Sequence, residues 1–322
     1  MLAVVSCTLG WTPLATPLAV RPRVQVSHQA AMVIDETTRD ASPSVGGAAV
    51  TSWQPAAFSS VVSTLGLTEK PYAADLGFDS FSMAGSTGEI KSFEGPGLPN
   101  VAWCSGLTLQ GGETACGSIT AFCGPLTDVP HLVASCTASS DGVDLYIDFR
   151  PRAEGAYDPQ YATLAEYPEP ETREAFAEGG NRKDFASAFF TEEVEAWRAS
   201  LLALGTPAAP LSKEQTSTIS AGPMLIDVKL PPTEEAAQAA ADACASAVDR
   251  WLTWMTTADE MNRGLPAGMR QTATYTRDTK VRANHFGFLL GRYTARFGDV
   301  DGKALATADA GPLDEAYVGG GS

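Results

Sequence analysis

Two neighbouring segments of alternating polarity constrain the fold of this 322-residue chain more than any other feature. Residues 131–137 and 143–150 both follow the two-residue period of a β-strand, and only residues 138–142 separate them. So short a connection joins antiparallel neighbours, so the pair predicts a β-hairpin. One face of this hairpin is apolar and the other is mixed. The mixed face is therefore either the wall of a pocket or a solvated surface.

The alternation assigns side chains to the mixed face. They are His131, Val133, Ser135, Thr137, Asp144, Tyr146, Asp148 and Arg150. We take Val133, Tyr146 and Asp148 as candidate ligand contacts on this face. Asp148 has a second interpretation, as a residue at a strand end that bonds a turn.

The remaining strands and helices are predicted from the hydrophobic pattern, which changes along the chain from mostly strand-like to mostly helical. Further strands are predicted over residues 77–83, 101–109, 116–123 and 224–230, and helices over 57–67, 161–167, 191–204, 233–257 and 279–297. Thr191 and Thr233, each followed by two glutamates, predict helix N-termini. Strands followed by helices without strict alternation predict an α+β fold rather than a doubly wound parallel sheet.

The charge balance excludes some functions. With 22 basic and 38 acidic side chains, the net charge of −16 disfavours binding to nucleic acid or to anionic membranes. Residues 262–303 reverse the sign, since they hold eight basic and three acidic residues. This region predicts either docking of an acidic partner or ligand, or a solvated helix surface. No Walker loop, Rossmann fingerprint, HExxH or GxSxG motif occurs, so no nucleotide cofactor, metal or serine nucleophile is indicated.

The metal-binding residue types are also uninformative. The six cysteines form no CxxC pair and match no zinc spacing, which predicts reduced and buried thiols. The three histidines lie far apart in the sequence. We therefore expect no metal or iron–sulfur site in this chain.

The two ends of the chain differ from the middle. Residues 1–34 are rich in Ala, Ser, Thr, Pro and Val and lack acids, a composition typical of an organelle transit peptide. A plastid is the predicted location. A secretory signal, or a signal followed by a transit region, is the competing interpretation. Polar and helix-breaking residues interrupt the apolar start, which disfavours a membrane span. Residues 35–56 are predicted to be a flexible lead-in, 57–317 the folded domain and 318–322 a flexible tail.

Two motifs in the predicted hairpin resemble a known enzyme family. Residues 128–132 read DVPHL, and residues 144–151 read DLYIDFRP. This D-x-P turn, strand, short hairpin and strand ending in D-F-x-P resembles the ferredoxin-dependent bilin reductases. Further segments look more like red chlorophyll catabolite reductase of the same superfamily. They are residues 158–161 (DPQY), 220–225 (SAGPML), 277–278 (RD) and 296–298 (RFG).

The resemblance, which spans residues 75–300, implies a fold and an activity. The fold is a three-layer α/β/α sandwich with a central antiparallel sheet. An open-chain tetrapyrrole binds between the sheet and the C-terminal helices. No cofactor is bound, electrons arrive singly from reduced ferredoxin, and side-chain acids supply protons. A homodimer is a further possibility, since red chlorophyll catabolite reductase is dimeric as a family.

The chain differs from the family at the two positions where the family has a proton-donating acid. Ser135 occupies the position of the proton-donating carboxylate, and residues 284–288 (NHFGF) lack the second acid. His131, His285 and Asp278 are the candidate substitutes, because imidazole titrates near neutral pH and Asp278 is the nearest upstream acid. Each has a structural alternative. Ser135 gives the pigment room, His285 packs in its helix, His131 opens a strand, and Asp278 pairs with an arginine or caps the helix.

Three arginines of the basic region have two possible roles. Arg277, Arg282 and Arg292 either hold the pigment's propionates, since a guanidinium matches a carboxylate, or form the ferredoxin surface. Two functions remain open on this basis. The protein is either a ferredoxin-dependent reductase of a linear tetrapyrrole, or a non-catalytic carrier that kept the pocket and lost the acids.

Overall fold

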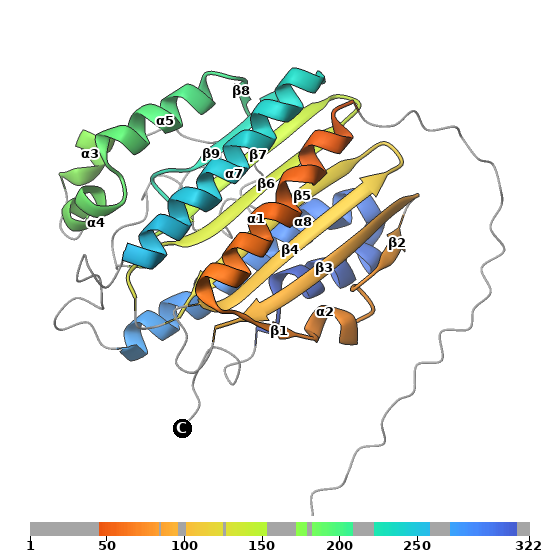
Figure 1. Cartoon of the computed structure of the whole chain (residues 1–322), viewed down its shortest axis with the longest axis horizontal. Helices are drawn as coiled ribbons and strands as arrows, with labels where there is room; N and C mark the ends of the chain where they lie inside the picture. The colour runs from red at the N-terminus through yellow and green to blue at the C-terminus, as the bar shows by residue number, and fades with distance from the viewer. Residues whose placement is uncertain are drawn as a thin grey trace, which may run out of the picture. The chain divides into compact units, whose positions relative to one another are not determined.

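An antiparallel sheet of nine strands forms the centre of the part of the chain that the structure describes (Figure 1). The strands are β1 (Thr68–Lys70), β2 (Phe81–Met83), β3 (Ser86–Glu94), β4 (Val101–Gly111), β5 (Ala115–Cys123), β6 (His131–Ser139), β7 (Gly142–Arg150), β8 (Thr206–Pro207) and β9 (Ile226–Leu230). Their order is β1-β3-β4-β5-β6-β7-β9-β8, with β2 paired to β3. Strands β3 to β7 therefore form a meander, and the predicted hairpin is its β6–β7 unit.

The computed structural model describes residues 45–83, 85–95, 101–124, 127–152, 172–178, 182–208, 222–257 and 271–313, with only the backbone for 182 and 271–277. The helices are α1 (Gly47–Leu65), α2 (Tyr72–Asp75), α3 (Arg173–Ala177), α4 (Arg182–Ala188), α5 (Glu192–Leu202), α7 (Glu234–Thr257) and α8 (Gln271–Ala310). Helices α1 and α7 cover one face of the sheet, and α8 covers the other (Figure 1). The predicted three-layer α/β/α sandwich is confirmed.

The apolar face of the hairpin builds the main core. Leu132, Leu145 and Ile147 are fully buried in one large cluster with residues of α1 and α7, including Val248 and Trp251. Burial of such side chains contributes about 1.5–3 kcal/mol each, so this layer supplies most of the driving force for folding.

Glycines let α1 approach the sheet closely. A Cβ atom on Gly117 would lie 2.3 Å from the carbonyl oxygen of Val50, and one on Gly106 would lie 2.2 Å from Nε2 of Gln54. Both distances are too short for a Cβ atom to fit without movement. Any other residue at Gly117 would push the backbone of α1 away from the sheet, whereas at Gly106 the side chains of Gln54 and Phe58 would have to move.

Helix α1 corrects the predicted lead-in. It begins at Gly47 rather than near residue 57, so residues 47–56 are helical. Pro55 argues against a helix from sequence alone, yet it lies inside α1. Val50 and Trp53 are buried against the sheet in this first half, and this packing outweighs the local preference.

Other element boundaries also differ from the predictions. Strand β3 was not expected, because its residues are mostly polar and small. Of residues 77–83, only Phe81–Met83 form a strand. Helix α8 extends past the predicted 279–297 in both directions, with a kink at Gly298. The helix predicted over 161–167 lies outside the described residues.

Two further expectations concern the described part of the chain. Five cysteines there are buried and carry no disulfide, in line with the predicted buried thiols, and Cys7 lies outside it. None of the helices described is both long enough and apolar enough to cross a membrane.

Candidate functional site

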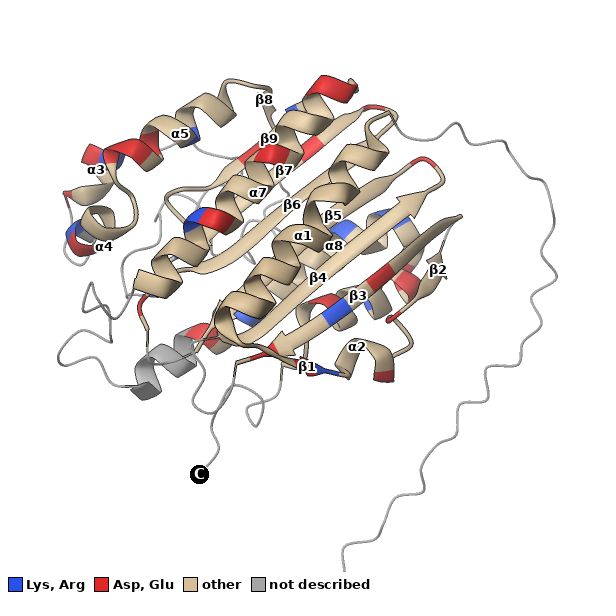
Figure 2. Cartoon of the chain, in the orientation of Figure 1, with Lys and Arg blue, Asp and Glu red and all other residues tan. Residues whose placement is uncertain are grey.

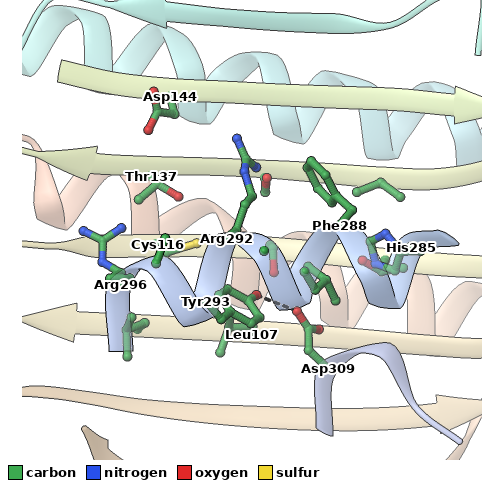
Figure 3. A pocket seen from close by; sticks show the side chains of 18 of the residues that line it. Leu107, Cys116, Thr137, Asp144, His285, Phe288, Arg292, Tyr293, Arg296 and Asp309 are labelled. Atoms are coloured by element: carbon green, nitrogen blue, oxygen red, sulfur yellow. Dashed lines mark hydrogen bonds between the residues drawn. The ribbon is translucent and has the colours of Figure 1, made fainter. Parts of the chain in front are cut away.

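A cavity of about 340 Å³ lies between the sheet and α8 (Figure 3). Pockets for small organic ligands are about 300–1,000 Å³, so this cavity reaches that range. Its floor is the mixed face of the hairpin together with the same face of β4 and β5. The floor residues are Leu107, Leu109, Cys116, Ser118, Thr120, Val133, Ser135, Thr137 and Asp144. Of the two interpretations of the mixed face, the structure therefore supports the pocket wall.

Strand register explains why these side chains meet. Cys116, Thr137 and Asp144 are cross-strand partners in one row of β5, β6 and β7. Ser118 and Ser135 are partners in the next row. Since side chains two residues apart share a face, both rows point to the same side of the sheet.

Small polar side chains occupy the middle of the floor. Ser135, at the position where the resemblance implies an acid, lines the cavity opposite Ser118. The hydroxyl of Ser118 is buried and makes no hydrogen bond to any described residue. Buried hydroxyls normally have a partner, so this one is available to a ligand.

His285 presents the clearest unsatisfied group of the cavity. It lies on α8, lines the cavity and is fully buried, and neither ring nitrogen bonds any described residue. The rings of Phe122 and Phe288 flank it, with centroids 5.4 Å and 6.2 Å from its own. Burial, reinforced by nearby arginines, lowers its pKa well below the ordinary value, so the ring is neutral. A neutral imidazole offers one donor and one acceptor to a ligand.

His131 and Asp278 form a buried pair outside the cavity lining. Nδ1 of His131 accepts from the backbone N–H of Cys123 at 2.9 Å, so Nε2 carries the proton and donates to Oδ1 of Asp278 at 3.0 Å. Arg152 binds both carboxylate oxygens of Asp278. Burial lowers the pKa of His131 to about 4, against the raising effect of Asp278. The structure thus matches the structural alternatives for both residues, and the pair ties α8 to β6.

The end of β7 carries a second buried network. Nε of Arg150 donates to Oδ2 of Asp148 at 3.0 Å, and Nη2 donates to the hydroxyl of Tyr146 at 3.2 Å. The other oxygen of Asp148 accepts from the backbone N–H of Gly222 at 2.9 Å. Neither Tyr146 nor Asp148 lines the cavity, and Asp148 bonds a turn, as its second interpretation proposed. Of the three candidate contacts on the mixed face, only Val133 reaches the cavity.

The arginines of the basic region have different environments. Arg292 lines the cavity, with its guanidinium 5.4 Å from the ring centre of Tyr146 and 4.7 Å from that of Phe288. Arg296 also lines it.

Arg282 is buried outside the cavity lining, where Nη2 donates to the carbonyl of Pro312 at 2.7 Å. It is therefore not exposed for a partner protein. The side chain of Arg277 lies outside the described residues.

Sequence reasoning missed one acid of the cavity wall. Asp309, near the end of α8, lines the cavity and is buried. Its Oδ2 accepts from the hydroxyl of Tyr293 at 2.7 Å (Figure 3). Its Oδ1 lies 3.1 Å from the hydroxyl of Ser105. Burial raises its pKa above the ordinary value. No local sequence pattern points to Asp309, because the kink at Gly298 that returns the chain to the cavity carries no sequence signal of its own.

Metal binding has no support among the described side chains, where no group of His, Cys, Asp and Glu is placed to hold an ion.

Acidic residues mark α5 and α7 on the other side of the sheet (Figure 2). The cavity wall is thus the place where basic, aromatic and unsatisfied polar groups meet.

The comparisons with known proteins identify the fold. No family model and no curated protein matches this sequence. The crystal structure of phytochromobilin synthase from tomato in complex with biliverdin matches with a TM-score of 0.56 and 12% sequence identity, over 83% of this chain and 84% of that chain. The chain has the bilin-reductase fold. The fold predicted from the D-x-P and D-F-x-P motifs is therefore confirmed.

Proposed function

We propose that this protein reduces an open-chain tetrapyrrole, a bilin or red chlorophyll catabolite, with electrons from reduced ferredoxin in a plastid. The observation that carries the proposal is the cavity between the sheet and α8, with the buried ring of His285, which bonds no described residue, in its wall. An unsatisfied buried polar group costs about 1–3 kcal/mol, so such a group in a cavity favours a ligand that pairs with it. The shared fold with a protein crystallised with biliverdin supports the choice of ligand.

The chemistry of the wall suits this ligand class. Pyrrole and lactam rings carry N–H donors and carbonyl acceptors, and the neutral ring of His285 can serve either kind. The hydroxyls of Ser118 and Ser135 add further polar partners. Arg292 and Arg296 supply guanidinium groups for the propionates, because a guanidinium pairs with a carboxylate through two parallel hydrogen bonds.

Electrons are proposed to come from outside the chain. The sequence carries no nucleotide motif, and a one-electron donor such as ferredoxin needs only to dock near the pigment. Each added electron must be matched by a proton, since charge on a pigment in a dry cavity is costly. The neutral His285 is a poor proton donor in this environment and is assigned to binding.

The experiment is an anaerobic titration of the protein with biliverdin and with red chlorophyll catabolite, followed by a ferredoxin-reducing system. We expect a shift of the visible spectrum on binding, then bleaching or a new band on reduction. A shift without reduction would favour the carrier, the function that Ser135 at the acid position suggests. No shift with either pigment would overturn the proposal.

Pigment binding by two arginine variants tests where the ligand lies. Arg292→Met is expected to weaken pigment binding by about 10–100-fold, because a hydrogen bond to a charged group contributes about 1.5–3 kcal/mol. Arg250→Met serves as the control. Arg250 lies on α7 on the opposite side of the sheet, where it pairs with Glu193. Equal affinities of the two variants would contradict the proposed site.

A further inference from the structure

A carboxyl group, a phenol and a serine hydroxyl meet at the wall of the cavity. Asp309 and Tyr293 both line it, and Ser105 reaches Asp309 from β4. The three residues are distant in sequence and converge because α8 turns back at Gly298. The close packing of Gly302 on the backbone of Tyr293 and Thr294 holds the two arms of α8 together.

The hydrogen bonds of this cluster fit a protonated Asp309. The hydroxyl of Ser105 has one hydrogen but lies within bonding distance of two oxygens of Asp309, the backbone carbonyl at 2.9 Å and Oδ1 at 3.1 Å. A carboxylate would have to share this one hydrogen with the carbonyl. When Oδ1 carries a hydrogen of its own and donates it to Ser105, both contacts are complete hydrogen bonds, because the serine hydrogen then goes to the carbonyl.

The remaining contacts agree with a neutral carboxyl group. Oδ2 accepts the hydroxyl hydrogen of Tyr293, so every polar atom of the cluster is paired. No Lys, Arg or His bonds Asp309 among the described residues, and its side chain is buried. A carboxylate there would lack a counter-charge, whereas a carboxylic acid needs none.

Among the described residues, the cavity has no other acid placed to give up a proton. Ser135 stands where a carboxylate was expected, and Asp278 is held by Arg152 and His131 outside the lining. Asp144 lines the cavity but is only partly buried, in the row of Thr137. Asp309 is therefore the one buried carboxyl group of the described lining, and its bonding fits a stored proton.

We propose that Asp309 is the proton donor to the bound tetrapyrrole, and that Tyr293 and Ser105 are its positioning residues. This inference rests on the proposed function. When one electron from reduced ferredoxin enters the pigment, the O–H bond of Asp309 breaks and a bond from that hydrogen to the pigment forms. The pigment becomes a neutral radical, ferredoxin is oxidised by one electron, and Asp309 becomes a carboxylate bonded by Tyr293 and Ser105.

A second round completes the reduction of one double bond. Asp309 regains a proton from water, and a second electron from ferredoxin and a second proton from Asp309 convert the radical to the reduced pigment. Two electrons and two protons are thus consumed. The hydrogen bonds from Tyr293 and Ser105 suit this cycle, because both hydroxyls can donate to the carboxylate that forms after each transfer.

The first test needs no pigment. The infrared spectrum of the ligand-free protein at neutral pH should contain the carbonyl stretching band of a protonated carboxyl group, and this band should be absent in Asp309→Asn. Tyr293→Phe should shift the band, because the hydrogen bond to Oδ2 is lost, and a merely structural role would not move it. Asp249→Asn, on the exposed side of α7, is the matched control and should keep the band. An unchanged band in Asp309→Asn would overturn the inference.

The second test follows single-turnover reduction of biliverdin by reduced ferredoxin. Asp309→Asn should bind the pigment with the wild-type affinity, yet reduce it about 10²–10⁴-fold more slowly, the contribution typical of a general acid. An unprotonated radical should accumulate in its electron paramagnetic resonance spectrum. Wild-type rates in Asp309→Asn would overturn the inference while the proposed function stands. If the wild type binds but never reduces the pigment, the proposed function fails, and the infrared band alone then reports on Asp309.

Discussion

Two buried histidines show how differently single residues are used where the sheet meets α8. His131 has both ring nitrogens paired, one with the backbone of Cys123 and one with Asp278. His285 is equally buried and has neither paired with a described residue. Phe122 contacts both rings, so the two lie in one aromatic environment. Since packing is similar, the difference in hydrogen bonding separates a structural residue from one kept for a ligand.

Replacing each histidine by phenylalanine should therefore have opposite effects. His285→Phe removes two unsatisfied nitrogens and keeps an aromatic ring, so the free energy of unfolding should rise by about 1 kcal/mol while pigment affinity falls. His131→Phe leaves Asp278 and the Cys123 amide without this partner, so stability should fall by about 2 kcal/mol. Urea unfolding and spectroscopic titration measure both quantities. A destabilised His285→Phe that still binds pigment normally would contradict this assignment.

The pH dependence of stability should also report on His131. Its pKa is about 4 in the folded protein, because it is buried, and near 6.5 when unfolded. Below pH 6.5 the unfolded chain binds a proton that the folded one does not, so this residue's contribution is complete above pH 6.5 and is lost as the pH falls toward 4. Between pH 7 and pH 5, the wild type should lose about 2 kcal/mol more than His131→Gln.

The difference between the wild type and His131→Gln isolates the contribution of His131 to the pH dependence of stability. Burial raises the pKa of Asp148 and of Asp309, and these groups make stability fall as the pH rises instead. Both are unchanged in His131→Gln, so their contributions cancel in the difference. Parallel curves of unfolding free energy against pH for the two proteins would rule out the assignment.

For single residues, the sequence predicted which face of the sheet each side chain lies on, but not whether that side chain reaches the cavity. Alternation placed Val133, Ser135 and Tyr146 on one face, and all three lie there. Whether a side chain reaches the cavity depends on distant partners. Tyr146 is covered by α8 and bonded by Arg150, and Asp278 is held by Arg152, 126 residues away. Such pairings leave no local pattern in a sequence.

Among the elements, the kinked helix α8 has the greatest consequence for the site. Its first arm supplies His285 and Arg292, and its second arm brings Asp309 back to Tyr293. Gly298 joins them with φ 78° and ψ 171°, a conformation essentially limited to glycine. The turn at Gly298 thus allows two helical segments to form one wall of the cavity.

Two glycine substitutions in α8 should distinguish the effect of backbone strain at the kink from the effect of close packing between its two arms. A Cβ on Gly302 would lie 2.5 Å from the backbone of Thr294, so Gly302→Ala should force the arms apart and lower stability by about 1–3 kcal/mol. Gly298→Ala has open space around it and should cost a similar amount through backbone strain alone. Only Gly302→Ala should disturb the carboxyl band of Asp309 in the infrared spectrum. The same band in both variants would show that Gly302 does not set the distance between the arms.

Element prediction succeeded where local pattern and tertiary packing agree. The strands of the β6–β7 hairpin and the N-cap of α5 at Thr191 follow from alternation and from a hydroxyl that accepts the N–H of Val194. Strand β3 was missed because its pairing with β4, rather than its polar residues, makes it a strand. The start of α1 was missed because Pro55 marks a break that packing on the sheet overrides.

Across the whole molecule, the two helical layers are bound to the sheet unequally. Helices α1 and α7 share one large apolar cluster with the sheet, built on residues such as Leu132, Ile147 and Trp251. The α8 side is divided into smaller clusters, one of them around Val133 and Phe288, and the cavity lies among them. Since local opening is easiest where the least apolar surface is buried, α8 should be the layer that opens to admit a ligand.

Hydrogen exchange of the ligand-free protein should show this order. Backbone amides of α8 between residues 281 and 297 should exchange faster than those in the middle of α7. Biliverdin at 100 times its Kd should slow α8 exchange by about 100-fold, because openings that break the site must then overcome about 2.7 kcal/mol of binding energy. Amides in the first turn of α5, which begins at Glu192 and contributes no residue to the cavity lining, provide the control and should be unaffected. Exchange in α8 as slow as in α7 without ligand, or unchanged with it, would show that the pigment enters without opening this layer.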